Sequence, residues 1–168
     1  GVPPPLAGSV DEATAERSRA YTLANGQFAL VHGLVGAALT LAVLLSGVLP
    51  WLDAALAGRD LRGGHRFVAF LAVLGVGGAL VSLPFAAFRT FVLEARFGFN
   101  RTTPRLWVLD RAKGFLIEAA LGIPLLYAMY AFMRFSGPRW WLWLFAFLMA
   151  VQLFMLWLYP AVIAPLFN

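Results

Sequence analysis

The sequence predicts an all-α polytopic membrane protein with four transmembrane helices. Of its 168 residues, 61% are hydrophobic and only 12% are charged, and the mean hydropathy is +0.79. A soluble domain carries about 25% charged residues, so this composition excludes a soluble enzyme, and so much apolar surface excludes a disordered chain. A transmembrane β-strand would show apolar and polar residues in alternation, and the apolar runs of this sequence do not alternate. Helices are therefore the spanning form that can pair every backbone group in lipid.

Four segments are long enough to cross a bilayer. A hydrocarbon core of about 30 Å needs roughly 20 apolar residues in a helix. The segments cover residues 28–49, 67–88, 114–133 and 140–159. Pro50 is expected to end the first helix and Pro160 the last, because proline cannot continue the hydrogen-bond ladder. Pro84 and Pro124 are expected to kink the two helices between them.

The chain divides into a polar lead-in, residues 1–26, and a membrane domain, residues 27–168. Asp11 to Ala24 of the lead-in is a candidate short surface helix.

Basic residues predict the orientation in the membrane, because cytoplasmic loops carry an excess of Lys and Arg. Eight lie on the side of the amino terminus and of residues 89–113, against five on the opposite side. Both termini and residues 89–113 are therefore expected in the cytoplasm, and the Arg and Lys serve as topology signals rather than as a nucleic-acid surface.

Two ionisable residues, His32 and Glu118, lie inside the predicted spans. Such groups are costly to desolvate, so each is a candidate functional residue that lines a polar cavity or takes part in a proton relay. The structural alternative is that each reaches the interface, Glu118 beside Arg111 two turns earlier. His65 lies between basic residues outside the spans and is expected to be a solvated loop residue.

Catalytic and metal-binding residues are not predicted in this chain. It has no Cys, and its two histidines are 33 positions apart, which excludes a His pair at helical spacing. A Gly-rich phosphate loop, a nucleophile elbow and a pair of carboxylates at catalytic separation are also absent from the sequence. We expect the chain alone to bind no stoichiometric zinc, to need no cofactor and to show no proteolysis.

Two short segments outside the spans stand out. Gly98 and Asn100 tolerate left-handed backbone, so the loop at 91–103 is expected to form a tight turn that leaves Phe97 and Phe99 to pack against something. The loop as a whole is expected to be structured and to dock on another domain. Thr102 or Thr103 can then cap a helix that begins at Pro104. The second segment, residues 163–168, leaves the membrane as an apolar, proline-containing tail after which more chain is expected.

These segments resemble the amino-terminal membrane region of the M48 zinc metallopeptidases of the CAAX prenyl protease, or Ste24-like, family. The resemblance covers the chain from about residue 65 onward. It is carried by EARFGFNRTT at 94–103, Asp110, Lys113, Pro124 and IAPLFN at 163–168, and more weakly by AERSRAY at 15–21, which looks like bacterial members. The matched positions carry over only as a structural signature: Gly98, Phe99, Asn100, Pro165, Leu166, Phe167 and Asn168.

The family resemblance implies a helical membrane barrel around a water-filled chamber, followed by a cytosol-facing peptidase domain. In that domain an HExxH motif and a downstream Glu bind zinc, which activates water for peptide hydrolysis. This chain contains no HExxH. It is therefore interpreted as the part that anchors the protease and walls the chamber, with zinc held outside it. Lipid, the peptidase domain and peptide or membrane-protein substrates are the implied partners, and a bacterial inner membrane is the expected location.

Two other functions remain open from the sequence. The chain could be a non-catalytic accessory subunit of a larger membrane complex, and a stop codon after Asn168 would favour that reading over an HExxH motif downstream. It could also be a transporter or channel. Four spans with two shallow ionisable residues and no pair of broken helices at mid-membrane argue against transport.

Overall fold

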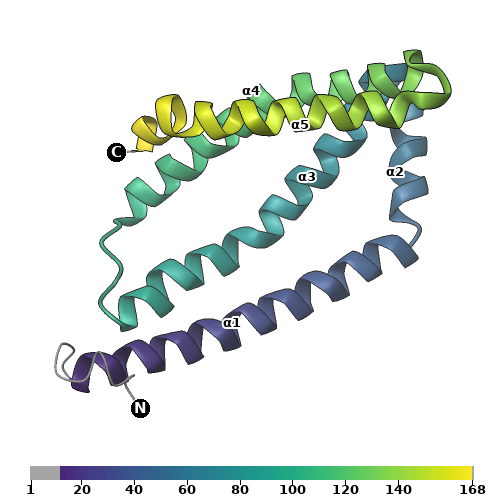
Figure 1. Ribbon diagram of the computed structural model, residues 1–168. Coiled ribbons are helices and arrows are strands. Elements are labelled where there is room, and N and C mark those ends of the chain that lie inside the picture. The colour runs from purple at the N-terminus through teal and green to yellow at the C-terminus, as the bar shows by residue number, and fades with distance from the viewer. Residues whose placement is uncertain (1–11, 168) are drawn as a thin grey trace. The chain divides into compact units, whose positions relative to one another are not determined.

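The computed structural model describes residues 12–167, and all regular structure in that range is helical (Figure 1). Four helices are long and apolar enough to cross a membrane, which confirms the predicted fold class. The proline run at 3–5, Asp11 and Asn168 lie outside the described residues. The α-helices are α1 (Glu12–Leu45), α2 (Val48–Ala57), α3 (Gly63–Phe88), α4 (Pro104–Phe135) and α5 (Trp140–Leu158).

Helix α1 is longer at its amino end than the predicted first span, and it ends earlier. It runs unbroken through the polar residues at 25–27, because no proline interrupts its backbone ladder there. The prediction that Pro50 ends this helix is wrong: α1 stops at Leu45, and Gly47 with φ +76° turns the chain. Pro50 instead lies in the first turn of α2, where a missing N–H is tolerated.

The contacts of the chain divide it into two units. The first comprises Gly1–Trp51 and Gly75–Thr102, and the second comprises Leu52–Leu74 and Thr103–Asn168. In the first unit α1 contacts η2 (Arg89–Glu94), a π-helical turn that continues α3. Arg89 and Glu94 are five positions apart, the repeat of π-helical hydrogen bonds, and their side chains are 3.4 Å apart.

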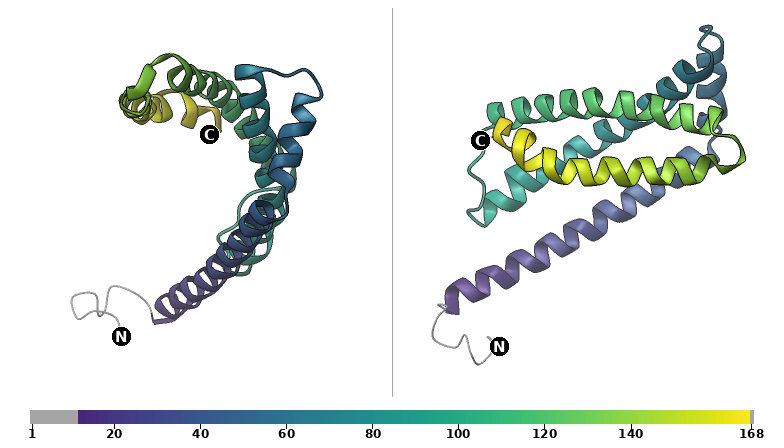
Figure 2. Two further views of the ribbon diagram at one scale, coloured as in Figure 1. Left: turned by 90° about the vertical axis from the view of Figure 1, so that its right-hand side faces the viewer. Right: turned by 45° about the horizontal axis from the view of Figure 1, so that its top comes forward.

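In the second unit α4 and α5 lie side by side, joined by a short turn that contains η3 (Gly137–Arg139) (Figure 2). Pro124 lies inside α4, as Pro84 lies inside α3. Helix α5 ends at Leu158, close to where Pro160 was expected to end it, but the chain stays helical. It continues as the π-helical η4 (Tyr159–Ile163) and the 3₁₀-helical η5 (Ala164–Phe167).

Pro160 accounts for the change of helix type at the end of α5. It lacks an N–H, and its ring would collide with a carbonyl of the preceding turn, so the α-helical ladder cannot pass through it. The ladder widens instead, and the N–H of Ala164 donates to the carbonyl of Tyr159, five residues earlier. Pro165 then lies in the tighter turn of η5. The end of the fourth span is thus a turned segment rather than a straight continuation.

Little of the apolar surface is buried between the helices. Among the described residues, the buried side chains are Leu52, Leu56 and Val68 in the second unit and Leu93 in the first. Large apolar side chains on all four long helices remain exposed. A soluble protein would not leave patches of this size in contact with water. The helices therefore need lipid, or other protein segments within the membrane, to cover them.

Candidate functional site

A side chain of α4 contacts the end of the segment formed by η4 and η5, hereafter the tail (Tyr159–Phe167). Lys113 Nζ donates a hydrogen bond of 3.2 Å to the carbonyl of Leu166, 53 positions along the chain. The same ammonium is 5.9 Å from the centre of the Phe167 ring and 3.6 Å from Asp110 Oδ1. Asp110, Lys113 and the tail, which the sequence presents as separate features, therefore meet at one point.

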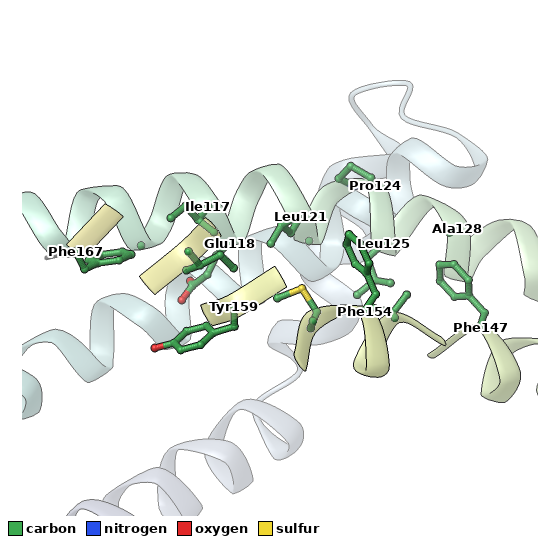
Figure 3. A pocket seen from close by; sticks show the side chains of 15 residues that line it. Ile117, Glu118, Leu121, Pro124, Leu125, Ala128, Phe147, Phe154, Tyr159 and Phe167 are labelled. Carbon is green, nitrogen blue, oxygen red and sulfur yellow. The ribbon is translucent and has the colours of Figure 1, made fainter. Parts of the chain in front are cut away.

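A groove of about 860 Å³ runs between α4 and the α5-tail segment (Figure 3). Phe167 lies at one end of this groove and Phe147 at the other. Apart from Glu118 and the hydroxyl of Tyr159, the side chains that line it are apolar. Such a lining suits an apolar chain or an apolar helix face, because apolar clefts with few polar groups hold ligands mainly by burial.

Glu118 is the acidic residue of this groove. Its side chain is exposed, and within the described part of the chain its carboxylate has no hydrogen-bond or ion-pair partner. The expected neighbour, Arg111, does not pair with it: its guanidinium lies 5.3 Å from the centre of the Trp107 ring. A carboxylate in an apolar groove attracts cations and hydrogen-bond donors. The groove can thus orient an occupant that carries such a group.

His32 lies among aromatic rings in the first unit. Its imidazole stacks on Phe28 of the same helix, with ring centres 6.0 Å apart, and is 4.7 Å from the ring of Phe85 in α3. Phe28 in turn stacks on Phe88 at 5.7 Å. His32 and Glu118 therefore belong to different units, and the contacts of His32 are aromatic.

The expected tight turn is present in the first unit, hereafter the aromatic turn (residues 97–100). Gly98 has φ +77°, where a Cβ is strained, and the amides of Phe99 and Asn100 both donate to the carbonyl of Glu94. Much of the expected loop is helical, since η2 extends to Glu94. Its phenylalanines pack against α1: Phe97 and Phe99 both make edge-to-face contacts with Tyr21, at 5.4 and 4.9 Å.

Two polar side chains lead from this turn into α4. Asn100 Oδ1 accepts a hydrogen bond from the amide of Thr102 at 2.7 Å, which is the local turn chemistry that favours Asn. Thr103 is the residue that caps α4, because its hydroxyl accepts the amide of Leu106 at 3.3 Å. Pro104 follows at the first helical position. The predicted start of this helix is confirmed.

His65 is exposed, as the sequence suggests, but it lies in a helix rather than in a loop. It lies in the first turn of α3, and its Nδ1 is 2.6 Å from the hydroxyl of Tyr127 in α4. Gly64 permits this approach, because a Cβ there would come within 3.1 Å of the Tyr130 ring. Next to it, Arg66 makes a two-point ion pair with Asp53 of α2. These contacts fasten α2, α3 and α4 within the second unit.

The described residues do not fit a zinc site. Zinc in proteins needs three or four ligands from Cys, His, Asp and Glu, and residues 12–167 contain no group of three that could hold a metal ion. His32 contacts aromatic rings, and His65 is held by a phenol. The chemistry of a metallopeptidase is therefore not assigned to any of residues 12–167.

Sequence reasoning missed three of these contacts: Tyr21 with the aromatic turn, His65 with Tyr127, and Lys113 with Leu166. Each joins residues far apart in the chain, and none follows a spacing that a single helix or turn would impose. One signal was available for the third. Lys113 is the only lysine among 13 basic residues, the other 12 being arginine.

Comparisons with known proteins agree with the resemblance found in the sequence. A family described as CAAX prenyl protease N-terminal, with five membrane helices, matches residues 1–168. The described residues contain four helices of spanning length, and α2 is a shorter apolar helix.

Similar proteins come from several eukaryotes. A CAAX prenyl protease 1 homolog of Oryza sativa is 36% identical over 99% of this chain and 41% of its own length. CAAX prenyl protease 1 of Saccharomyces cerevisiae is 32% identical over 99% of this chain and 39% of its own. The crystal structure of S. mikatae Ste24p has a TM-score of 0.84 at 30% identity, covering 99% of this chain and 40% of that one. The chain thus spans about two fifths of the length of these relatives.

Proposed function

Because the chain belongs to the CAAX prenyl protease amino-terminal family, we propose that it anchors an M48-type zinc metalloendopeptidase in the membrane and forms part of its chamber wall. The observation that carries the proposal is the match over the whole chain, together with four long helices whose apolar surfaces remain uncovered. On this proposal the catalytic HExxH part lies outside the 168 residues. The substrate is a protein or peptide that reaches the site at the membrane.

The mechanism assigned to this chain is confinement. A wall that holds a substrate close to the catalytic residues replaces a bimolecular encounter with a local one and raises the effective concentration. The groove between α4 and α5 supports this role, because its apolar lining and single carboxylate can hold and orient an amphipathic segment. Bond breaking itself is not assigned to Glu118 or His32, which we propose as chamber-lining residues.

The experiment that tests the proposal compares this chain with a protein that also contains the residues encoded after Asn168. The longer protein is expected to contain HExxH, to bind one zinc and to cleave a peptide substrate. The 168-residue chain, which contains no HExxH, is expected to bind no stoichiometric zinc and to cleave no peptide. A stop codon directly after Asn168, or a longer protein without zinc and without cleavage, would favour the accessory-subunit function instead.

The role of the groove is tested by Glu118→Ala in the longer protein, with Glu118→Gln as the control of similar volume. If Glu118 lines the chamber, Glu118→Ala should change the relative rates at which several substrates are cleaved, and Glu118→Gln should act in the same direction if the charge is what matters. Unchanged rates for every substrate would argue against this role.

For orientation, we propose that both termini and residues 89–113 face the cytoplasm, in a bacterial inner membrane. The distribution of eight basic residues against five supports the orientation, and the Arg-, Ala- and Leu-rich composition supports the location, although the relatives above are eukaryotic.

The orientation can be tested by labelling single cysteines. The chain has no cysteine, so Ala95→Cys and Gly58→Cys each give a unique thiol at an exposed position. A membrane-impermeant maleimide applied to intact cells should label the Gly58→Cys variant and spare the Ala95→Cys variant, and the reverse pattern would invert the orientation.

A further inference from the structure

The tail continues the helical chain of α5, but as a turned segment in which the α-helical ladder gives way to other helix types. Its backbone passes from α5 through a π-helical turn into a 3₁₀ turn, with a proline in each. The side chains of Leu166 and Phe167 at its end are both exposed, so burial does not fix them. A contact with another element can therefore contribute to fixing the direction of this segment.

Lys113 is the residue of α4 that holds it. Its ammonium has three groups around it: the Leu166 carbonyl at 3.2 Å, the Asp110 carboxylate at 3.6 Å and the Phe167 ring at 5.9 Å. A carbonyl, a carboxylate and the face of a ring all attract a cation. Two of these three groups belong to the tail, and the third lies one turn earlier on α4.

The choice of lysine is specific here, since every other basic residue of the chain is arginine. An ammonium is a compact charge with three donors that rotate, so it can face an oxygen, a second oxygen and a ring in three directions. A guanidinium is a larger planar fork whose donors have fixed relative directions and suit bidentate carboxylates. The geometry around Lys113 therefore matches lysine better than arginine.

Asp110 keeps the cation in place. Its Oδ1 is buried and, among the described residues, has no hydrogen-bond partner, so the ammonium at 3.6 Å is the charge that compensates it. Leaving a buried carboxylate oxygen without that compensation is unfavourable. The Asp110 side chain thus keeps Lys113 directed at the end of the tail rather than extended toward solvent.

We propose that Lys113 is a positioning residue that clips the tail onto α4 and so fixes the direction in which the chain leaves the fourth span. Because Phe167 also lines one end of the groove between α4 and α5, the clip holds that end of the groove in shape. The clip itself does not depend on the proposed function. The consequence of the clip does depend on the proposed function. If a peptidase domain follows the tail, Lys113 sets the direction in which the chain enters that domain relative to the groove.

The experiment measures tail mobility in the protein reconstituted in lipid nanodiscs. Leu166→Cys gives a unique site for a nitroxide and keeps the backbone carbonyl that Lys113 binds. Lys113→Met, Lys113→Arg and Asp110→Asn are compared with Arg105→Met, which removes a cation from the same helix. Lys113→Met should mobilise the label and speed hydrogen exchange at the Ala164 amide about fivefold, the change expected from losing one partly exposed charged contact.

The variants separate the possible outcomes. Lys113→Arg should resemble Lys113→Met, Asp110→Asn should lie between Lys113→Met and the parent, and Arg105→Met should leave the tail unchanged. A label equally immobile in Lys113→Met and in the parent, with unchanged exchange at Ala164, would overturn the proposal, as would an equal effect of Arg105→Met. These readouts involve no proteolysis. A longer protein that lacks peptidase activity would therefore refute the proposed function and leave the clip to be judged on its own result.

Discussion

The aromatic turn of the first unit and the tail of the second are both irregular segments that follow a membrane span, yet they are held differently. The aromatic turn packs two phenylalanines against Tyr21 and pairs two amides with one carbonyl. The end of the tail accepts a hydrogen bond from one ammonium of α4, that of Lys113. Apolar packing distributes stability over several contacts, whereas a charged contact concentrates it in one residue that salt can screen.

A small membrane domain with almost no buried core can thus fix its irregular segments by two kinds of contact. An aromatic cluster suits a turn that joins two spans of the chain, because ring packing depends little on ionic strength. A single charged contact suits a segment whose direction matters more than its stability. The amides of Phe99 and Ala164 report the two regions separately, since each donates to a backbone carbonyl within its own region.

The largest expected effect comes from Tyr21→Ala, which removes both edge-to-face contacts of the aromatic turn. Each aromatic pair contributes about 0.5–1.5 kcal/mol beyond its buried area, so the turn should lose about 2 kcal/mol. Hydrogen exchange at Phe99 and Asn100 should then become roughly 30 times faster, and exchange at Ala164 should not change. Nuclear magnetic resonance in nanodiscs measures these rates.

Tyr21→Phe is the control, because it keeps the ring and removes only the hydroxyl. It should retain most of the protection at Phe99. If Tyr21→Phe were as damaging as Tyr21→Ala, ring packing would not be what holds the turn, and the contrast with the tail would lose its basis.

The second effect comes from Gly98→Val. The φ of +77° at this position is unfavourable for a residue with a Cβ, and more so for a β-branched one, by about 1–2 kcal/mol. Exchange at Phe99 should rise by about tenfold. Gly33→Val in α1 has open space around it and an ordinary φ, so it serves as the matched control and should leave the turn unaffected.

The third effect is that of Thr103→Ala, which removes the cap of α4. Loss of such a cap costs about 1 kcal/mol, so the amide of Leu106 should exchange about five times faster. Thr103→Ser keeps the hydroxyl and should preserve the protection. An unprotected Leu106 amide in the parent protein would show that the cap does not form, and α4 would then begin later than Pro104.

The features that the sequence predicts are those that depend on local chemistry. Span length, the left-handed Gly98 and the Thr103 cap each follow from residues next to one another. The position of Pro50 was misjudged because a proline near the end of an apolar run can equally begin the next helix, and here Gly47 provides the turn. Proline is unfavourable in the interior of a helix, but that rule is satisfied both when Pro50 ends one helix and when it lies in the first turn of the next.

The contacts that define the candidate site could not be predicted in the same way. His65 and Tyr127 are 62 positions apart, and Lys113 and Leu166 are 53 apart, so each pairing depends on how helices pack rather than on spacing. Glu118 was found because a carboxylate inside a span is costly, but its expected partner Arg111 lies over Trp107 instead. Packing between helices, which lipid makes weakly specific, decides these details.

The smallest expected effect is the response to salt, and it tests the comparison most directly. Raising the ionic strength from about 0.1 to 1 M shortens the Debye length from about 10 to 3 Å, which weakens a partly exposed charged contact and leaves ring packing unchanged. Lys113 is 48% exposed, so exchange at Ala164 should rise by about twofold while exchange at Phe99 stays constant. In Lys113→Met the salt response at Ala164 should disappear. A parallel response at Phe99, or one that persists in Lys113→Met, would mean that salt acts on the membrane domain as a whole, and the two regions would then not differ in how they are held.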